Sequence, residues 1–537
     1  MTAPDPCNPD QMLEAIDSPS VPKPQKIAIS ARGMVSTQHY LATQAGVQML
    51  EQGGNAIDAA VAAAFALGVC EPAASGLGGQ TMMLIHLAQT RRTFALDGSS
   101  RAPNRTSLET LSKKRRHRGY KATTVPSTPA VLNYALERYG VLNLTNVMRP
   151  AIRLAEDGYP ITELQRRLTL RTKRYLRRRS AGALFLKNAS RTFKEGDLFI
   201  QPALAYTLKR LAHKGITDFY TGRIAEMICH DMAAHDGLIT PEDLAQIPMP
   251  IERKAVRGQF DDWQIVTFPP PGAGRTLIEL LNIISHFPKK FRDTDTPEGA
   301  VLLAEAIRQA NRDRRDRPYD PNFYAQVTNK RMSSIDYAKY IARSSLRQLR
   351  TGGETTHLSV MDKDGNVVAL TQSIERVYGA CVATPELGFL YNNYMLAFDD
   401  KDMSHPYYLR PNAVPWASVA PTIILRNRRP WLAIGSPGSE RIVSAIVQVL
   451  LRLKKQMPFD AVNAPRMHCS HDGTVSLEAP HMRSDIPAAL ERHGFTIDPR
   501  EPYSFYLGCI QLVLREGDHF VGIADPRRDG SAKGPDE

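Results

Sequence analysis

The sequence has no apolar run long enough to cross a membrane. Its longest near-continuous run, Ala59 to Cys70, covers 12 residues, whereas a membrane-spanning helix needs about 20. The first 30 residues also lack the apolar segment that a secretory signal peptide requires. We therefore expect no membrane partner, a cytoplasmic location in preference to a periplasmic one, and a disordered leader over residues 1–30.

Cysteine is scarce and irregularly spaced. The six cysteines lie far apart and form no Cys-x-x-Cys pair, so we expect reduced thiols, although six thiols can in principle form disulfides. Residues 468–472 (His-Cys-Ser-His-Asp) include metal-binding residue types. Their spacing fits no standard zinc pattern and no second cluster completes four ligands, so the sequence predicts no metal site.

Positive charge is in excess, with 68 lysines and arginines against 55 acidic residues among 537 residues. Two basic segments, residues 113–118 and 166–179, carry much of this excess and raise the question of a polyanion-binding site. Few aromatic residues interleave the arginines, and the sequence has no nucleic-acid-binding motif. A solvated helix face or loop explains both segments better, and we expect no nucleic-acid partner.

The hydrophobic pattern is that of a globular α/β protein. Apolar residues make up 42% of the chain, which is enough for a large core. Their spacing predicts helices over residues 40–52 and 56–69, and a mostly helical middle between about 125 and 350. After Thr355 the sequence becomes rich in strand-forming residues. Thr356–Met361 and Asn366–Thr371 predict a β-hairpin joined by Asp-Lys-Asp-Gly.

Thr355 follows Gly352-Gly353-Glu354 and begins the predicted hairpin. Threonine at the start of a strand is common and by itself indicates no function. The chemical alternative is that the chain cuts itself before Thr355. A newly freed α-amino group, with a pKa of about 7.7–8.0, can then act as the base that a weakly nucleophilic hydroxyl needs. The glycine pair gives the preceding segment the freedom that such a cut requires.

Residues 352–366 (Gly-Gly-Glu-Thr-Thr-His-Leu-Ser-Val-Met-Asp-Lys-Asp-Gly-Asn) resemble the processing and active-site segment of the γ-glutamyltransferase (γ-glutamyl transpeptidase) family. The resemblance extends from about residue 30 to about residue 527, and the agreement of several motifs in register makes it specific. The other segments similar to the family, in its order, are Gly53–Val61, Gly76–Gly79, Leu96-Asp97, Ala102-Pro103, Pro269–Pro271, Asn392–Met395, Ala420–Ile423 and Gly435–Gly438.

This resemblance implies an α/β fold of the N-terminal-nucleophile hydrolase type, a four-layer αββα sandwich with additional helices. It also implies a proenzyme cut between Glu354 and Thr355, with a large part over residues 31–354 and a small part over residues 355–537 that associate as a heterodimer. Thr355 Oγ would attack the γ-amide carbonyl of glutathione or a related compound. The acyl group would then pass to water or to an amino acid or peptide amine, without a metal or organic cofactor.

Two further catalytic features carry over from the family by position. The family's oxyanion hole consists of two consecutive backbone N–H groups at the Ser-Pro-Gly motif, here Gly438 and Ser439, the second of which is usually glycine. A backbone donor survives any substitution except proline, so the chemistry stays possible. Ser373 matches a family hydroxyl that hydrogen-bonds the nucleophile. The alternative interpretation is that all three are ordinary strand and turn residues.

The positions that bind the substrate's α-carboxylate depart from the family pattern. The family arginine two residues after Leu-Asp is replaced by Ser99, and Arg101 stands two residues further on. An assisting Ser-Ser pair is here Ala417-Ser418, so only Ser418 keeps its hydroxyl. We hypothesise that Arg101 supplies the missing positive charge from its shifted position.

The positions that hold the substrate's α-amino group depart as well. The family's Asn, Gln and Asp correspond to Glu375, Tyr394 and Ala397, so the usual aspartate is absent. A desolvated ammonium group needs an anionic or carbonyl partner, and we hypothesise that Glu375 supplies it. The segment between Phe398 and Pro415 is short compared with family members that carry a lid loop, which predicts a more open acyl pocket.

Three functions follow from these observations. The main hypothesis is an autoprocessed γ-glutamyltransferase-like enzyme that cleaves γ-glutamyl amides. The first alternative is an amidohydrolase or acylase of the same fold that acts on a non-γ-glutamyl amide. The second alternative is an inactive relative that binds a polyanion. It predicts an uncut chain of 59.7 kDa.

Overall fold

The structure is a computed structural model that describes residues 24–109, 111–246, 250–316 and 354–536. These residues form two seven-stranded sheets, sheet A and sheet B, in which all neighbouring strands are antiparallel. Sheet A has the order β1 (Ile27–Ser30), β18 (His519–Ala524), β17 (Gln511–Glu516), β13 (Arg429–Gly435), β12 (Thr422–Arg426), β9 (Trp263–Thr267) and β8 (Val256–Phe260). Sheet B has the order β19 (Ser531–Lys533), β2 (Gly33–Thr37), β10 (Glu354–Asp362), β11 (Val367–Glu375), β3 (Gln80–Leu87), β4 (Arg92–Gly98) and β7 (Ile251–Lys254).

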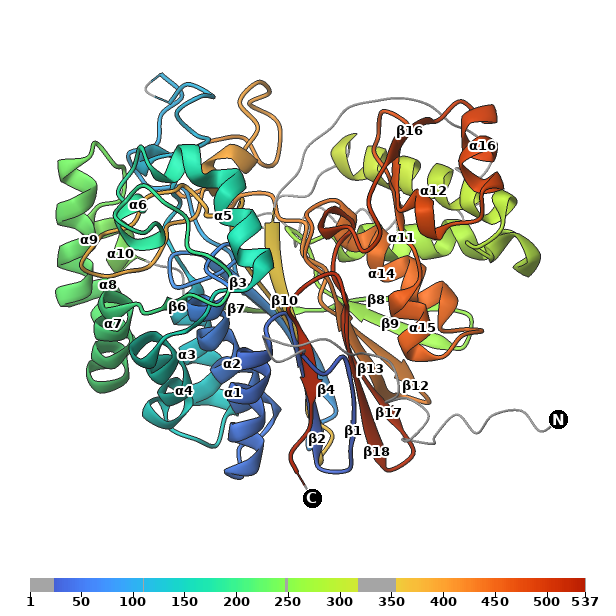
Figure 1. The fold of residues 1–537 in the computed structure, drawn as a ribbon, viewed down its shortest axis with the longest axis horizontal. Helices are drawn as coiled ribbons and strands as arrows, with labels where there is room; N and C mark the ends of the chain where they lie inside the picture. Colours follow the sequence, from blue (N-terminus) through green and yellow to red (C-terminus); the bar gives the residue numbers. More distant parts are fainter. Residues whose placement is uncertain (1–23, 110, 247–249, 317–353, 537) are drawn as a thin grey trace.

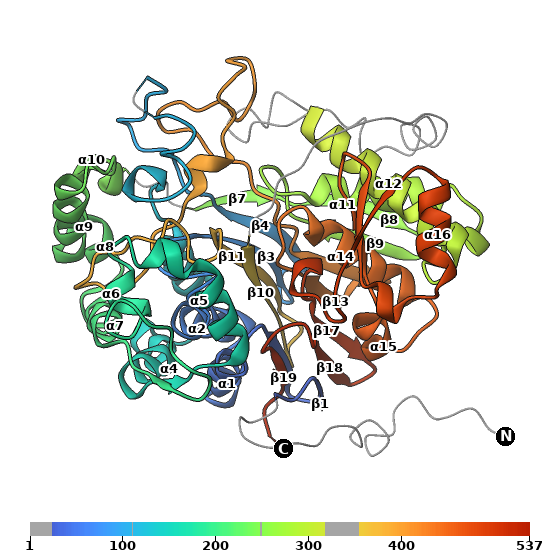
Figure 2. The same cartoon turned by 45° about the horizontal axis from the view of Figure 1, so that its top comes forward.

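The two sheets are stacked between two layers of helices (Figure 1 and Figure 2). The outer face of sheet B is covered by α1 (Tyr40–Glu51), α2 (Ala56–Cys70) and α3 (Thr128–Tyr139). The outer face of sheet A is covered by α11 (Gly274–Ser285) and α14 (Arg441–Arg452). This is the four-layer αββα sandwich that the resemblance implied, so the predicted fold class is confirmed.

Additional helices extend both outer layers, again as predicted. They are α4 (Leu144–Asp157), α5 (Glu163–Leu176), α6 (Gly182–Phe185), α7 (Pro202–Lys214), α8 (Thr217–Thr221), α9 (Arg223–Ala234), α10 (Pro241–Ala245), α12 (Pro297–Asp316), α15 (Pro458–Asn463) and α16 (Asp485–Arg492). Two small sheets contain β14 (Met467–Cys469), β15 (Thr474–Leu477) and β16 (Thr496–Pro499), and β5 (Tyr159–Pro160) with β6 (Leu198–Phe199). Short 3₁₀ turns are η2 (Tyr120–Ala122), η3 (Lys289–Arg292), η5 (Tyr394–Ala397), η6 (Ala479–His481) and η7 (Phe505–Leu507).

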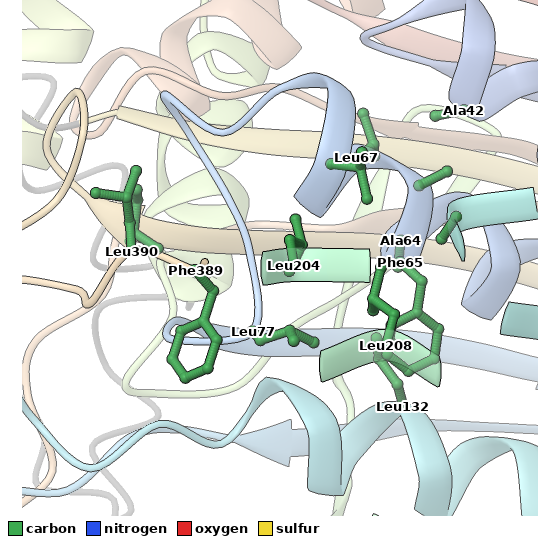
Figure 3. Packing of buried hydrophobic residues seen from close by; sticks show 14 of the residues in the cluster. Ala42, Ala64, Phe65, Leu67, Leu77, Leu132, Leu204, Leu208, Phe389 and Leu390 are labelled. Atoms are coloured by element: carbon green, nitrogen blue, oxygen red, sulfur yellow. The ribbon is translucent and has the colours of Figure 1, made fainter. Parts of the chain in front are cut away.

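Buried apolar side chains fill the spaces between the four layers. On the outer side of sheet B, Phe65 and Leu67 of α2 belong to one cluster with Leu132 of α3 and with Leu204 and Leu208 of α7 (Figure 3). Because each sheet is covered on both faces, its strands are buried along most of their length. The cluster between the two sheets includes Met34, Met82, Phe268, Ile423 and Phe520.

Helix α2 begins at the predicted residue because Asn55 caps it. Asn55 Oδ1 accepts hydrogen bonds from the N–H groups of Ile57 (2.8 Å) and Asp58 (3.2 Å), and Asp58 Oδ2 accepts from the Asn55 N–H (2.8 Å). This reciprocal capping box satisfies N–H groups that have no partner within the helix. The alanines of α2 are buried and allow close packing against sheet B.

The predicted hairpin is the pair β10 and β11 in the centre of sheet B. Leu358 of β10 pairs with Leu370 of β11 and with Thr37 of β2, so β10 is an interior strand. Its pairing with β2 begins only at Leu358, and its pairing with β11 is irregular between Glu354 and Thr356. The start of β10 therefore lies beyond the regular ladder, where side chains from other segments can reach it. The glycine pair before Glu354 lies outside the described residues.

The expected leader needs a correction at its C-terminal end. Ile27–Ser30 form β1, which pairs with β18 at the edge of sheet A. These four residues are ordered because their backbone groups join a sheet ladder. Residues 1–23 lie outside the described part of the chain, and a leader there stays a prediction.

The first basic segment, residues 113–118, is not uniformly solvated. Arg116 is buried and forms an ion pair with Asp400, and Arg118 donates a 2.9 Å hydrogen bond to the carbonyl of Val377. The solvated-face interpretation is wrong for these two arginines because they bind groups that are 259 to 284 residues away in sequence. The arginines of α5 and the turn after it that are exposed, as this interpretation requires, are Arg167, Arg171, Arg174, Arg177 and Arg178.

Candidate active site

Thr355 lies at the start of β10 and is almost completely buried. Its Oγ1 is 3.5 Å from Ser373 Oγ on the neighbouring strand β11. The Ser373 hydroxyl in turn accepts a 2.8 Å hydrogen bond from the N–H of Glu375. Extending the pairing of Thr356 with Gln372 by one residue places Thr355 opposite Ser373, just before the register shifts at the pair of Glu354 and Glu375. The structure thus brings Thr355 and Ser373 together as the sequence predicted.

Tyr394, in η5, also belongs to this cluster. Its hydroxyl interacts with the side chains of Ser373 and Gln80, and burial together with the negative charge of Glu375 raises its pKa. Tyr394 is therefore a neutral phenol that can donate or accept a hydrogen bond beside Ser373 and Thr355. Gln80, at the first position of β3, accepts from the Ser100 N–H (2.9 Å) and hydroxyl (3.0 Å).

Sequence reasoning missed Gln80 and Ser100. Gln80 directly follows the Gly76–Gly79 motif and Ser100 directly precedes Arg101. Their positions next to these two segments were the only feature from which the sequence could have indicated them. Their residue types gave no further indication, because glutamine and serine are common in strands and turns.

Glu375 ends β11 directly opposite the expected cleavage site. Its Cα is paired with that of Glu354, and its φ of 77° lies in the left-handed region that disfavours residues other than glycine. Such backbone strain is characteristic of functional sites, where the surrounding structure holds the residue in place. The half-buried Glu375 is the acidic residue that the structure places within the Thr355, Ser373 and Tyr394 cluster.

Gly438 and Ser439 lie in the loop between β13 and α14. Both have left-handed backbones, with φ of 118° and 54°. Their carbonyls accept hydrogen bonds from the N–H groups of Arg441 and Ile442, both 3.0 Å. Within the described part of the chain their own N–H groups donate to no acceptor. Two consecutive free donors are what a tetrahedral oxyanion requires.

Gly435, the last residue of β13 before the loop that carries these donors, packs against β10. A Cβ atom on Gly435 would lie 2.2 Å from Cε1 of His357, so only glycine fits against that ring. His357 is two residues after Thr355 and bonds through Nδ1 to Thr371 Oγ1 at 2.8 Å. Burial lowers the pKa of His357 to about 3, which keeps the ring neutral. This contact ties the Gly438 loop to the strand that begins at Thr355.

The predicted carboxylate-binding residues make contacts with other segments. Arg101 Nη1 donates to the carbonyl of Asn412 at 3.3 Å. Ser418 Oγ accepts a 3.1 Å hydrogen bond from Nη1 of Arg314, an arginine of α12 that sequence reasoning missed. Arg314 also lies over the ring of Trp416 at 4.8 Å. Burial lowers the pKa of Arg314 to about 10, an effect that the negative charge of Glu440, next to Ser439, opposes.

Arg528 contacts the main chain of Thr355. Arg528, in the loop between β18 and β19, donates from Nη1 to the Thr355 carbonyl oxygen at 3.2 Å and to Glu71 Oε1 at 3.1 Å. Burial raises the pKa of Glu71 to about 7, although Arg528 acts in the opposite direction. Among the described residues, no group of three or more His, Cys, Asp or Glu side chains is arranged to hold a metal ion.

Comparison with known proteins agrees with this architecture. The family model described as Gamma-glutamyltranspeptidase matches residues 42–534. A glutathione hydrolase proenzyme of Escherichia coli (strain K12) is 33% identical over 531 residues, covering 92% of this chain and 90% of the relative. The acylase ACY 1 proenzyme of Pseudomonas sp. (strain V22) is 34% identical over 537 residues, covering 94% of each. The crystal structure of cephalosporin acylase from Bacillus halodurans has a TM-score of 0.87 at 27% identity, covering 98% of this chain and 100% of that chain.

The αββα sandwich with a threonine at the head of an interior strand defines an N-terminal-nucleophile hydrolase. The matched family model and the two curated relatives each cover most of the chain. The chain belongs to the gamma-glutamyltranspeptidase family. The family resemblance and the enzyme class predicted from the sequence are thus confirmed. No helix in the described ranges is both long and apolar enough to span a membrane, and a cytoplasmic location stays a prediction.

Proposed function

We propose that the chain is a proenzyme that cuts itself between Glu354 and Thr355 and then cleaves γ-glutamyl amides such as glutathione. The observation that carries the proposal is the contact between Thr355 Oγ1 and Ser373 Oγ at the head of β10. Both the E. coli relative and the Pseudomonas acylase are proenzymes. The cut would give a large part over residues 31–354, behind the leader, and a small part over residues 355–537 that stay associated.

Self-cleavage uses the same hydroxyl as the later reaction. Thr355 Oγ1 attacks the carbonyl carbon of Glu354, the bond from that carbon to the Thr355 nitrogen breaks, and the nitrogen takes up a proton. Water then hydrolyses the resulting ester. The products are a carboxylate on Glu354 and a free α-amino group on Thr355. That amine is the general base that the intact chain lacks.

In the mature enzyme the α-amino group of Thr355 accepts the proton of Oγ1 as the oxygen attacks the substrate amide carbonyl. The N–H groups of Gly438 and Ser439 stabilise the negative charge on the tetrahedral oxygen. The amide C–N bond breaks, and the amine leaves with the proton held by the α-amino group. Water or an acceptor amine then attacks the acyl ester and releases Thr355. Ser373 orients the hydroxyl through both steps.

Substrate recognition rests on the residues that depart from the family pattern. Glu375 binds the ammonium group of the γ-glutamyl moiety, with Tyr394 beside it, and Arg101 and Ser418 bind its carboxylate. The position of Glu375 in the nucleophile cluster supports the first assignment. The assignment of Arg101 and Ser418 to the carboxylate is supported by the positive charge of Arg101 and the hydroxyl of Ser418. The contact of Ser418 with Arg314 adds a second positive charge.

An acylase acting on a non-γ-glutamyl amide is the second candidate function. Two relatives are named acylases, and this chain has Ala397 where the family resemblance expects an aspartate. Without that carboxylate, an acyl group that carries no ammonium would bind with little loss. Both candidates use the same nucleophile and differ only in the acyl pocket.

Two measurements test these proposals. Denaturing electrophoresis and N-terminal sequencing of the purified protein should show two chains, the smaller beginning at Thr355, whereas Thr355→Ala should stay whole. Release of p-nitroaniline from γ-glutamyl-p-nitroanilide, with and without glycylglycine, is then compared with release from glutaryl-p-nitroanilide, which lacks the α-amino group. Preference for the glutaryl compound favours the acylase. An uncut wild-type chain that binds a polyanion with a steep salt dependence would favour the inactive relative.

A further inference from the structure

Arg528 reaches the nucleophile from a loop that crosses between the two sheets. The loop joins β18 of sheet A to β19 of sheet B, and Figure 2 shows β19 at the edge of the sheet that contains β10. The Arg528 side chain is fully buried and its guanidinium lies 4.2 Å from the centroid of the Phe505 ring. From there Nη1 donates to the Thr355 carbonyl oxygen at 3.2 Å.

The Thr355 carbonyl lies where the pairing of β10 with its neighbouring strands is incomplete. The β2 ladder starts three residues later, at Leu358, and the β11 ladder is irregular between Glu354 and Thr356. A buried carbonyl without a hydrogen bond is destabilising, and a charged donor gives the stronger bond. Arg528 therefore supplies a charged hydrogen-bond donor to the Thr355 carbonyl at a point where the strand pairing of β10 is incomplete.

The loop that carries Arg528 is itself anchored on both sides. Lys26 Nζ donates to the carbonyls of Arg528 (2.8 Å) and Gly530 (2.6 Å). Thr162 Oγ1 donates to Asp529 Oδ2 at 2.6 Å. The preceding Arg527 is buried in ion pairs with Glu478 and Asp525. A guanidinium on so constrained a backbone fixes the position of the group that it binds.

We propose that Arg528 is a positioning residue that holds the main chain of Thr355 in place for catalysis, with Glu71 as the counter-ion that orients its guanidinium. This inference rests on the proposed role of Thr355 as nucleophile. After self-cleavage Thr355 is a chain terminus and no longer has a covalent neighbour on its N-terminal side. Its carbonyl is then the main-chain group through which the fold can keep its α-amino group and Oγ1 aligned.

Glu71 follows the last residue of α2 and faces a small set of charged and titratable groups. These are Arg528 and Asp529 from the loop and Cys70 from α2, with the Thr356 side chain as a neutral partner. Lys26 faces the loop from the other side. Glu71 is ionised above a pKa of about 7. The carboxylate therefore orients Arg528 at pH 8 and loses its charge below pH 7.

The test compares Arg528→Lys, Arg528→Met and Glu71→Gln with a matched control, Arg292→Met. Arg292 also donates to main-chain carbonyls, of Phe287 and Ser285, but lies in η3 beside sheet A. For each protein we would measure the rate of self-cleavage, the melting temperature, and kcat and KM for γ-glutamyl-p-nitroanilide or, if it is preferred, the glutaryl compound. Failure of the wild type to cut itself would count against the proposed function and is distinguishable from any effect of Arg528.

We expect Arg528→Met to lower kcat about 100-fold with KM changed less than threefold, since displacement of a reacting group by about 1 Å has an effect of this size. Arg528→Lys should recover part of this loss, and Arg292→Met should retain wild-type kcat. Glu71→Gln should flatten the change of kcat between pH 6 and 8. If Arg528→Met fails to fold, the kcat of Arg528→Lys tests the proposal in its place. Wild-type kcat in a folded Arg528 variant, or loss of fold in both, would overturn the proposal.

Discussion

Ser373 Oγ stands 3.5 Å from Thr355 Oγ1 and, on its other side, accepts the Glu375 N–H at 2.8 Å. A hydroxyl that is fixed by a main-chain donor has little freedom to turn away from its second partner. The short strand segment that ends β11 therefore holds the hydroxyl proposed to orient Thr355 and carries the acidic residue proposed to recognise substrate.

Replacing Ser373 by alanine should slow both self-cleavage and turnover. We expect kcat to fall about 10-fold, because a single neutral hydrogen bond contributes about 0.5–1.5 kcal/mol. Ser373→Thr keeps the hydroxyl and should retain more activity. Steady-state kinetics on the mature protein check this, with Ser285→Ala as the control, since the Ser285 hydroxyl donates to the Asn282 carbonyl in its own helix. A Ser373→Ala enzyme as fast as the wild type would contradict the orienting role.

Substitution of Glu375 by glutamine should separate substrate binding from processing. The side chain loses its charge while its N–H still bonds to Ser373, so self-cleavage should proceed normally. KM for γ-glutamyl-p-nitroanilide should rise about 10- to 100-fold, as expected for loss of a charged hydrogen bond. The exposed Glu386→Gln serves as control. Equal KM values in the two variants would remove Glu375 from the ammonium site.

Arg101→Gln tests the proposed carboxylate partner in the same way. We expect a rise in KM of similar size and an unchanged rate of self-cleavage, because self-cleavage requires no bound substrate carboxylate. Arg314→Gln is the informative comparison, since Arg314 binds Ser418 directly. If only Arg314→Gln raises KM, the carboxylate site belongs to α12, and the assignment of Arg101 is wrong.

Adding a methyl group at Gly435 should destabilise the sandwich. The new Cβ would overlap the His357 ring at 2.2 Å, and overpacking of this kind typically lowers the free energy of unfolding by about 1–3 kcal/mol. Urea denaturation of Gly435→Ala, His357→Ala and the double variant measures the effect. The two losses should not add, because removing the ring removes the overlap. Additive losses would show that the contact has no energetic role.

Acid should destabilise the fold through buried histidines. Burial lowers the pKa of His468 to about 3, with the positive charge of Arg441 acting in the same direction. In the unfolded chain histidine takes up a proton below about pH 6.5. The free energy of unfolding therefore falls as the pH drops from about 6.5 toward 3. Urea unfolding at pH 7.5, 6.0 and 5.0 should show a smaller fall in His468→Gln than in the exposed control His519→Gln. If the free energy of unfolding falls equally with pH in both variants, His468 is not a source of the acid destabilisation.

Patterns within a few residues of one another predicted much of the fold. The start of α2 at Ala56, the hairpin of β10 and β11, and the position of Thr355 at a strand head depend on local hydrogen bonding and on periodicity, and the structure confirms them. The order of motifs along the chain further indicated the family and its αββα sandwich. Interactions between distant segments gave no comparable signal. Arg116 illustrates this, because a basic run indicates solvent exposure while its partner, Asp400, is 284 residues away.

The sequence by itself therefore determined the enzyme class and the family, and it predicted Thr355 as the nucleophile, because each is encoded in short motifs with fixed chemistry. Only the tertiary structure decided which charged groups meet those motifs. Arg528 is 173 residues from Thr355, and Arg314 is 104 residues from Ser418. Such pairs form because the packing of the sheets, helices and connecting loops brings distant segments together. That outcome depends on the packing of the whole core, and no local pattern of residues records it.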